Sequence, residues 1–324
     1  MEIGQLAQGR AARRHAPDQA TFLIDRNINY TNICTSKCRF CAFYRTADAP
    51  DAYVLSPEAI LEKVAEAARL GATQIMLQGG LNPGLGLPWY EDVLQRIKKD
   101  FTIFIHSFSP PEIHSLAKKE QLSYEAVITR LRDAGLDSIP GAGAEILTDG
   151  VRARISPEKI SGATWLAVME AAHSIGLKTT ATMMMGSIET PQDRIEHLRL
   201  LRTLQDKTGG FRAFIPWTFK AVNTELGGTE TSSLDYLRTL ALSRIYLDNI
   251  DNIQGSWVTQ GKDIGQMTLF FGANDLGSIM LEENVVRAAG SSNRITETGM
   301  VELISRAGKK PAQRDTQYRI VKTY

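Results

Sequence analysis

Short apolar runs rich in β-branched residues alternate with segments of helical periodicity along most of the chain. The apolar runs predict eight strands, at 22–29, 73–78, 102–106, 136–139, 178–184, 212–216, 252–256 and 276–281. The segments between them repeat their apolar positions with the spacing of one helix face. This alternation is typical of repeated βα units, in which helices cover a parallel sheet.

Residues with capping preferences mark the ends of several predicted helices. Ser56 and Ser156 each precede a proline, so each pair supplies an N-cap and a proline at the first helical position. Gly71 and Gly176 occupy positions where C-caps belong.

No segment rich in Pro, Gly or Ser divides the chain, which favours one domain. The 324 residues, 43% of them hydrophobic, can bury the large core that a single barrel needs. We therefore predict an α/β fold, a TIM-type (βα)8 barrel with its core at 21–285. Short extensions at 1–20 and 286–324 complete the prediction, the second of them packed on the barrel.

Charge and hydropathy exclude other classes of protein. The chain carries 37 basic and 36 acidic residues, so it has no general electrostatic attraction for nucleic acid or an anionic membrane. No apolar run approaches the length of a membrane span, and no apolar stretch follows the basic start at Arg10, Arg13 and Arg14. We expect a cytoplasmic protein that begins with a soluble helix and has no nucleic-acid or membrane partner.

Three cysteines, Cys34, Cys38 and Cys41, are the only ones in the chain. An odd number without a signal peptide favours reduced thiols over disulfides. A structural zinc site needs four protein ligands and a 4Fe–4S cluster normally takes four thiolates, yet this loop offers three and no histidine. A metal centre held here would keep one open position. Ordinary thiols or a structural zinc knuckle are the alternative, although a knuckle would need a fourth ligand that the loop lacks.

The chemistry of a (βα)8 barrel lies at the C-terminal ends of its strands. The cysteine loop follows the first predicted strand, and Gly79-Gly80, His106 and Gly186 follow the second, third and fifth. Paired glycines let the backbone approach a ligand closely, although they can equally form a turn. Glu145 follows the fourth strand in a loop rich in Gly and Ala, where a carboxylate that is not solvated can accept hydrogen bonds from ribose hydroxyls.

The spacing C-x3-C-x2-C, with Phe40 directly before the last cysteine, resembles that of the radical S-adenosylmethionine (SAM) enzymes. Further segments resemble the branch of this family that serves the futalosine pathway and deazaflavin formation, at 25–32, 41–45, 106–112, 140–147 and 272–277. The resemblance implies a 4Fe–4S cluster on Cys34, Cys38 and Cys41, with an open iron that chelates SAM. An electron from the reduced cluster would cleave SAM to a 5′-deoxyadenosyl radical, which abstracts a hydrogen from the substrate.

The resemblance also implies a set of SAM contacts. A glycine-rich motif of the family, which holds the SAM amino group, corresponds to Gly79 and Gly80. A G-x-I-x-G-x-x-E element beside the adenine corresponds to Gly186 and Glu189, with Thr182 in place of the opening glycine. The predicted cofactor-binding residues are Phe40, Gly79, Gly80, Glu145, Gly186 and Glu189.

Within the branch, segments 214–219 and 254–257 look most like the cyclases of menaquinone biosynthesis. In those enzymes the adenosyl radical takes the C4′ hydrogen from the ribose of dehypoxanthinyl futalosine, and the carbon radical adds to the benzoate ring. The adduct then loses an electron and a proton, so the site needs a base and an electron acceptor, for which the oxidised cluster is a candidate. A reducing partner such as flavodoxin or ferredoxin is also implied.

Position at strand ends nominates His106, Glu282 or Glu283 as the base. His106 is preferred because the ordinary pKa of histidine, about 6.5, makes a neutral imidazole available at cellular pH. A substrate with a benzoate and a sugar requires a planar cation and aromatic walls. The predicted substrate contacts are Arg45, Trp217 and Gln254.

Other functions share this cluster and barrel. Aminofutalosine synthase and the tyrosine-dependent deazaflavin synthase component are the alternatives, and in this chain only the segments near predicted strands six and seven discriminate between them and the cyclase. An iron–sulfur carrier or a zinc-stabilised interaction protein is the alternative of a different class. A carrier would bind the cluster without cleaving SAM.

Overall fold

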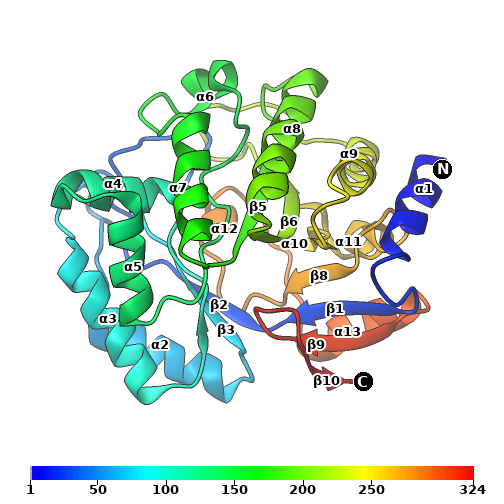
Figure 1. The fold of residues 1–324 in the computed structure, drawn as a ribbon, viewed down its shortest axis with the longest axis horizontal. Coiled ribbons are helices and arrows are strands. Elements are labelled where there is room, and N and C mark those ends of the chain that lie inside the picture. Colours follow the sequence, from blue (N-terminus) through cyan, green and yellow to red (C-terminus); the bar gives the residue numbers. More distant parts are fainter. Residues whose placement is uncertain (1) are drawn as a thin grey trace.

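In the computed structural model, which describes residues 2–324, every strand except the last pairs in parallel, and helices lie outside them (Figure 1). The strands are β1 (Gln19–Leu23), β2 (Asp25–Ile28), β3 (Gln74–Leu77), β4 (Phe104–Ile105), β5 (Thr179–Met185), β6 (Phe211–Thr218), β7 (Asn252–Ile253), β8 (Asp275–Ser278), β9 (Lys310–Arg314) and β10 (Ile320–Thr323).

Helices follow the strands in sequence. They are α1 (Glu2–Ala11), α2 (Pro57–Arg69), α3 (Leu87–Asp100), α4 (Pro110–Glu120), α5 (Tyr124–Ala134), α6 (Asp149–Ile155), α7 (Gly162–Ser174), α8 (Pro191–Thr208), α9 (Ser233–Tyr246), α10 (Trp257–Gln260), α11 (Lys262–Thr268), α12 (Val285–Ala288) and α13 (Glu297–Arg306). Among residues 2–324, none of these helices has the length and apolarity needed to cross a membrane.

Isolated β-bridges connect the separate groups of hydrogen-bonded strands into a closed barrel. Parallel pairing joins β2, β3 and β4 in one ladder and β5, β6 and β7 in another. Ser138 bridges to His106 and Ile139 to Thr179, so segment 136–139 joins β4 to β5. Gln254 bridges to Asp275 at the start of β8, and β8 pairs with β1. The (βα)8 barrel predicted from the sequence is therefore confirmed.

The first predicted strand, 22–29, is two strands rather than one. β1 pairs with β8 and β9, whereas β2 pairs with β3. The chain changes partners at Ile24, which is buried between the two halves. In a twisted, closed barrel one extended segment can pair with different strands along its length. An apolar run in the sequence does not show where the pairing partner changes.

The predicted helix caps are partly confirmed. Ser56 begins α2 and its side chain accepts a hydrogen bond from Ala59 N at 3.2 Å. Gly71 and Gly176 follow α2 and α7 with φ of +83° and +84°, the left-handed conformation that glycine adopts freely.

The prediction at Ser156 is wrong, because Ser156 ends α6 rather than beginning a helix. Lys159 N donates to Ser156 O at 3.0 Å, which closes a turn after the proline. The next helix, α7, begins at Gly162 and is capped by Ser161.

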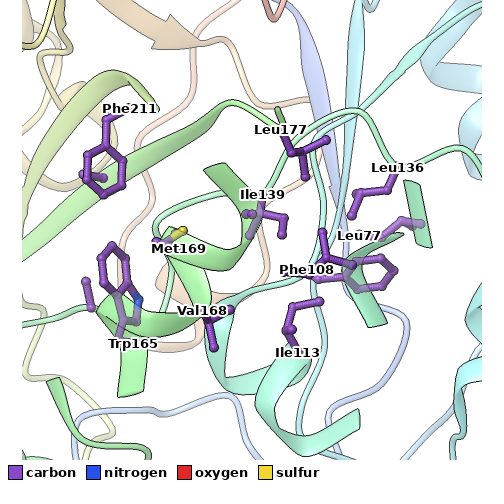
Figure 2. Close-up of a cluster of buried hydrophobic side chains, with 14 of the residues drawn as sticks. Leu77, Phe108, Ile113, Leu136, Ile139, Trp165, Val168, Met169, Leu177 and Phe211 are labelled. Atoms are coloured by element: carbon purple, nitrogen blue, oxygen red, sulfur yellow. The ribbon is translucent and has the colours of Figure 1, made fainter. Parts of the chain in front are cut away.

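The main core lies between the strands and the surrounding helices. Figure 2 shows Trp165, Val168 and Met169 of α7 directed at residues of the strands and of their connecting segments. All three side chains are fully buried, and the Trp165 ring stacks on Phe211 with a centroid distance of 6.3 Å. This packing fixes the strands, and with them the residues on the inner wall of the barrel.

Two strands near the end of the described chain, β9 and β10, were not predicted. β9 lies parallel to β1 and β10 antiparallel to β9, as the red and blue arrows of Figure 1 show. Beyond β9, Thr316 donates to Gln74 at the start of β3, and Arg314 contacts Asp275 at the start of β8. Segment 314–318 therefore lies at the N-terminal end of the barrel, opposite the face of the βα loops.

Candidate active site

The three cysteines lie on the loop between β2 and α2. Ile33 bridges to Arg45 in parallel, and Cys34 N donates to Arg45 O at 3.0 Å. Cys41 N donates to Cys38 O at 3.0 Å, which forms a tight turn. These bonds fold the loop over the C-terminal ends of the strands, and all three thiols line one cavity of about 410 Å³.

Arg45 shapes the cysteine loop and is not among the residues that line this cavity. Its Nε donates to both carboxylate oxygens of Asp51, at 2.9 and 2.7 Å, and its Nη1 donates to three carbonyls of residues 42–44. The predicted contact of Arg45 with the substrate stays a prediction.

Gly79 and Gly80 lie where the cysteine loop crosses the end of β3. A Cβ on Gly80 would lie 2.1 Å from Ile33 O and 2.8 Å from Cys34 Cβ. A Cβ on Gly79 would lie 2.5 Å from the Tyr30 ring. Both glycines line the cavity, and close packing against the cysteine loop requires them.

Glu112, which the sequence analysis missed as a functional residue, lies beneath this glycine pair. Its carboxylate accepts hydrogen bonds from Tyr30 Oη at 2.5 Å, from Gly79 N at 3.3 Å and from the Ser109 hydroxyl. Burial raises the pKa of Glu112 to about 7 against the opposing effect of these bonds. The pattern S-x-x-E at Ser109 is a capping box signal that could have located it.

Glu145 lies on the opposite wall, close to the cysteines. It is 5% exposed with φ of +40°, and its Oε1 accepts a hydrogen bond from Lys159 Nζ at 3.2 Å. Its Oε2 is buried and accepts no hydrogen bond among residues 2–324, although Arg152 Nη1 lies 3.9 Å from it. Lys159 Nζ also lies 5.2 Å from the centre of the Phe40 ring. The unpartnered oxygen faces a cavity that Phe40, Glu145 and Lys159 all line, which fits a ligand with hydroxyl donors.

Gly186 and Glu189 lie outside the cavity lining, and their contact with the cofactor stays a prediction. The Glu189 carboxylate accepts hydrogen bonds from Gly186 N and Ser187 N, and pairs with Arg194 at 2.9 Å. Its side chain is fully buried. The carboxylate therefore turns back onto its own loop and stabilises the bend that follows β5.

His106, Trp217 and Gln254 line the cavity from β4, β6 and β7, as their strand-end positions predicted. Nδ1 of His106 is buried without a partner among residues 2–324. Burial lowers the pKa of His106 well below its ordinary value, and the charges of Arg212 and Arg314 lower it further. The imidazole is therefore neutral at physiological pH and has one nitrogen available.

The two glutamates after β8 differ in their surroundings. Glu282 lies outside the cavity lining and pairs with Arg26 at 2.7 Å and Lys63 at 2.8 Å. Burial would raise its pKa, but the hydrogen bonds from Lys63, Asn284 and Arg26 together lower it. An ion-paired carboxylate with a lowered pKa is a weaker base, so these contacts favour the other candidates over Glu282.

Glu283 lines the cavity instead. It accepts hydrogen bonds from Asn27 Nδ2 at 3.2 Å and Val286 N at 2.8 Å, and burial raises its pKa.

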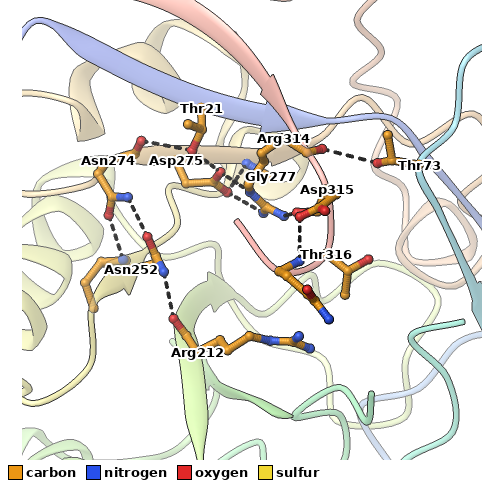
Figure 3. A network of polar contacts seen from close by, with 12 residues as sticks. Thr21, Thr73, Arg212, Asn252, Asn274, Asp275, Gly277, Arg314, Asp315 and Thr316 are labelled. Carbon is orange, nitrogen blue, oxygen red and sulfur yellow. Dashed lines mark hydrogen bonds and ion pairs between the residues drawn. The ribbon is translucent and has the colours of Figure 1, made fainter. Parts of the chain in front are cut away.

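A polar network closes the cavity at the N-terminal end of the barrel (Figure 3). Arg314 donates to both oxygens of Asp275, at 2.6 and 2.9 Å, and its guanidinium lies 3.8 Å from the centre of the Tyr318 ring. Asp25 accepts from Ser278 and from Gln74, and burial raises its pKa to about 6. The sequence analysis missed this floor because Arg314 and Tyr318 come from outside the predicted barrel core.

The three cysteines provide the donor set of an iron–sulfur cluster. Burial raises the pKa of Cys38 to about 12 and that of Cys41 also, so these thiols need a positive metal to be held as thiolates. In residues 2–324, no three Cys, His, Asp or Glu side chains are grouped around a single metal ion. A cubane cluster requires no such convergence, because each of its cysteines binds a different iron. The three cavity-lining thiols therefore fit a cluster with one open iron.

Comparison with known families supports the same assignment. Residues 28–201 match the radical SAM superfamily, and residues 208–324 match the CofH/MqnC C-terminal region. The chain belongs to the radical SAM superfamily. This radical SAM protein is therefore an enzyme, and its cofactors are a 4Fe–4S cluster and SAM.

Several proteins of known name are similar to this enzyme over most of its length. It is 48% identical over 321 residues to a cyclic dehypoxanthine futalosine synthase of Streptomyces coelicolor, covering 98% of this chain and 80% of the relative. A synthase of the same name from Halalkalibacterium halodurans is 45% identical over 100% of this chain and 88% of its own. A 5-amino-6-(D-ribitylamino)uracil–L-tyrosine 4-hydroxyphenyl transferase of Methanopyrus kandleri is 42% identical over 95% of this chain and 86% of its own.

Solved structures share the fold at low sequence identity. Methylornithine synthase superposes with a TM-score of 0.76 and 18% identity, covering 96% of this chain and 88% of its own. The FeFe-hydrogenase maturase HydG from Carboxydothermus hydrogenoformans has a TM-score of 0.77 and 17% identity, covering 98% of this chain and 73% of its own. These likenesses support the barrel and carry no information about the substrate.

Proposed function

We propose that the enzyme is a cyclic dehypoxanthine futalosine synthase of menaquinone biosynthesis. It converts dehypoxanthinyl futalosine to the cyclic product by abstraction of the ribose C4′ hydrogen and formation of a carbon–carbon bond to the benzoate ring. The observation that carries the proposal is the 48% and 45% identity, over nearly the whole chain, to two synthases of that name.

The residues of the βα-loop face divide between cofactor and substrate. When bound, the reduced cluster cleaves SAM and supplies the 5′-deoxyadenosyl radical. Cys34, Cys38 and Cys41 hold the cluster, and the glycine pair lets the backbone approach SAM. The unpartnered Oε2 of Glu145 accepts a hydrogen bond from a ribose hydroxyl.

The inner wall of the barrel handles the substrate. Trp217 and Gln254 border the cavity from neighbouring strands and enclose the sugar and the ring. His106 accepts the proton that the ring loses, because its free Nδ1 belongs to a neutral imidazole. Glu283 is the second candidate base, since it lines the same cavity with a raised pKa.

We also infer the cellular setting of the enzyme. A low-potential donor such as flavodoxin or ferredoxin reduces the cluster, and the reaction takes place in the cytoplasm. A small-molecule substrate fits the cavity of about 410 Å³.

The test is anaerobic. The protein is reconstituted with iron and sulfide, reduced, and supplied with SAM and synthetic dehypoxanthinyl futalosine, and the products are followed by mass spectrometry. Formation of 5′-deoxyadenosine together with the cyclised product is the expected result. Radical formation that depends on tyrosine and a ribityl uracil instead would favour a transferase like the 42% identical Methanopyrus kandleri protein. A cluster-loaded protein that never cleaves SAM would contradict both functions.

A further inference from the structure

The cavity is lined by three basic side chains, which differ in their partners. Lys159 pairs with Glu145 at 3.2 Å, and Arg314 pairs with Asp275 at 2.6 Å. The third, Arg212, has no carboxylate within 4.0 Å in the described part of the chain. Arg212 is thus the cavity-lining cation that forms no ion pair with a carboxylate of residues 2–324, although Asp315 and Asp137 act on its charge from farther away.

A β-bulge directs Arg212 into the barrel. Thr179 of β5 pairs with Phe211 of β6, but the next residue, Thr180, pairs with Ala213. Arg212 is the extra residue between these pairs, near the N-terminal end of β6. Bulges of this kind bend a strand and re-aim one side chain, and they are common beside active sites.

The Arg212 guanidinium keeps part of its hydrogen-bonding capacity free. Its Nη2 donates to the Ser138 hydroxyl and to Lys178 O at 3.4 Å. Its Nε is buried and has no partner among residues 2–324. An unpartnered buried guanidinium nitrogen calls for an acceptor that a ligand can supply.

The acidic groups nearest to Arg212 have partners of their own. Asp137 pairs with Lys98 at 2.6 Å, and Asp315 pairs with Arg319 at 2.6 Å. Neither carboxylate is therefore available to neutralise Arg212.

A second unpartnered group lies on the same wall. His106 bridges to Ser138, the residue that the Arg212 guanidinium contacts, and its Nδ1 lacks a partner within residues 2–324. The free imidazole nitrogen and the free guanidinium edge therefore belong to neighbouring positions of one cavity.

We propose that Arg212 binds the carboxylate of the substrate's benzoate at the floor of the barrel, an assignment that rests on the proposed function. Dehypoxanthinyl futalosine carries its sugar at one end and its carboxylate at the other. The C4′ hydrogen must lie near the cysteine loop, at the C-terminal ends of the strands, so the carboxylate points to the N-terminal end where Arg212 lies. This pose puts the aromatic ring between the cluster and Arg212, within the region that His106 lines.

Substrate binding tests the assignment without turnover. The affinity of the unreduced, cluster-loaded enzyme with SAM is measured by anaerobic calorimetry for dehypoxanthinyl futalosine and for its carboxamide. The parent enzyme is expected to bind the acid on the order of 10- to 100-fold more tightly than the amide, because hydrogen bonds between charged groups are strong. Arg212→Gln should bind acid and amide about equally. The control Arg199→Gln, on the surface of α8, should behave as the parent.

Two measurements separate binding from a structural role. Arg212→Gln should retain SAM affinity and thermal midpoint, whereas a role limited to holding Ser138 would lower the midpoint and leave the acid preference intact. Should Arg212→Gln fail to fold, Arg212→Lys keeps the charge but loses the planar fork, and a partial loss of the acid preference is expected.

The outcomes are distinguishable from failure of the proposed function. Equal binding of acid and amide by the parent enzyme, or an unchanged preference in the Arg212 variants, overturns the assignment even if cyclisation proceeds. Tight, Arg212-dependent binding of the acid without any cyclised product supports the carboxylate site and overturns the proposed function instead.

Discussion

At the scale of single residues, Gly80 determines whether the cysteine loop can close. A side chain there would collide with Ile33 O, a backbone atom that cannot move without moving Cys34. We expect Gly80→Ala to reduce bound iron and sulfide to a small fraction of the parent value. Gly9→Ala is the matched control, because its new Cβ meets no atom within 4 Å. Full cluster content in Gly80→Ala, measured after anaerobic reconstitution, would contradict this reading of the contact.

Glu112 should give the enzyme a pH-dependent stability. Burial raises the pKa of Glu112 from its ordinary value of 4.5 to about 7, so between these values the folded state binds more protons than the unfolded state. Stability is therefore lost as the pH rises through this window, by about 3 kcal/mol if the full shift holds. Glu112→Gln mimics the protonated carboxyl, so the variant should gain thermal midpoint relative to the parent from pH 5 to pH 8. A difference that stays constant with pH would show that Glu112 titrates normally.

From residue types and predicted strand ends, the sequence identified part of the cavity lining. It did not show which charged side chains pair with one another. Cys34, Gly80 and His106 line the cavity as predicted, because a strand end fixes where a following residue lies. Arg45 and Glu282 lie outside this lining, and each pairs with a residue of its own loop or of a neighbouring helix. Such partners depend on the tertiary fold, so no local pattern indicates them.

At the scale of elements, the segment after β9 contributes a buried ion pair to the barrel floor. Arg314 and Asp275 are 3% and 0% exposed, and each would be an uncompensated charge without the other. We expect Arg314→Ala to lower the free energy of unfolding by about 3 to 5 kcal/mol, measured by urea denaturation. The double variant Arg314→Met with Asp275→Leu should recover much of this loss, because it leaves no buried charge. Equal losses in the single and double variants would exclude charge burial as the cause.

The strands that the sequence did not reveal are β9 and β10. Segment 136–139 makes only isolated bridges and β7 has two residues, yet the apolar runs predicted a strand at both places. All four residues of β10 are exposed, which leaves no apolar alternation to recognise. The alternation of the longer strands and helices was sufficient for the fold class, because each βα unit repeats the same constraint.

At the scale of the whole molecule, cofactor binding should couple to folding. A ligand that binds only the folded state stabilises it by about 2.7 kcal/mol at 100 times its Kd. We expect SAM to raise the thermal midpoint of the cluster-loaded protein and to have little effect on the cluster-free protein, since chelation needs the open iron. Equal midpoint shifts in both forms, measured anaerobically by differential scanning fluorimetry, would mean that SAM binds without the cluster.

The pairing of β1 with β9 has a consequence for how the chain acquires its structure. Gln19 lies beside Lys310, so almost the whole described chain separates two neighbours in one ladder. Contacts between residues that are far apart in the sequence form late in folding, because the chain loses the entropy of closing a long loop before it gains the contacts. During synthesis β1 leaves the ribosome long before β9 and has no partner on that side until residues 310–314 follow. The barrel is therefore completed after most of the chain has been made, and a chaperone that shields β1 in the meantime would raise the yield of folded enzyme.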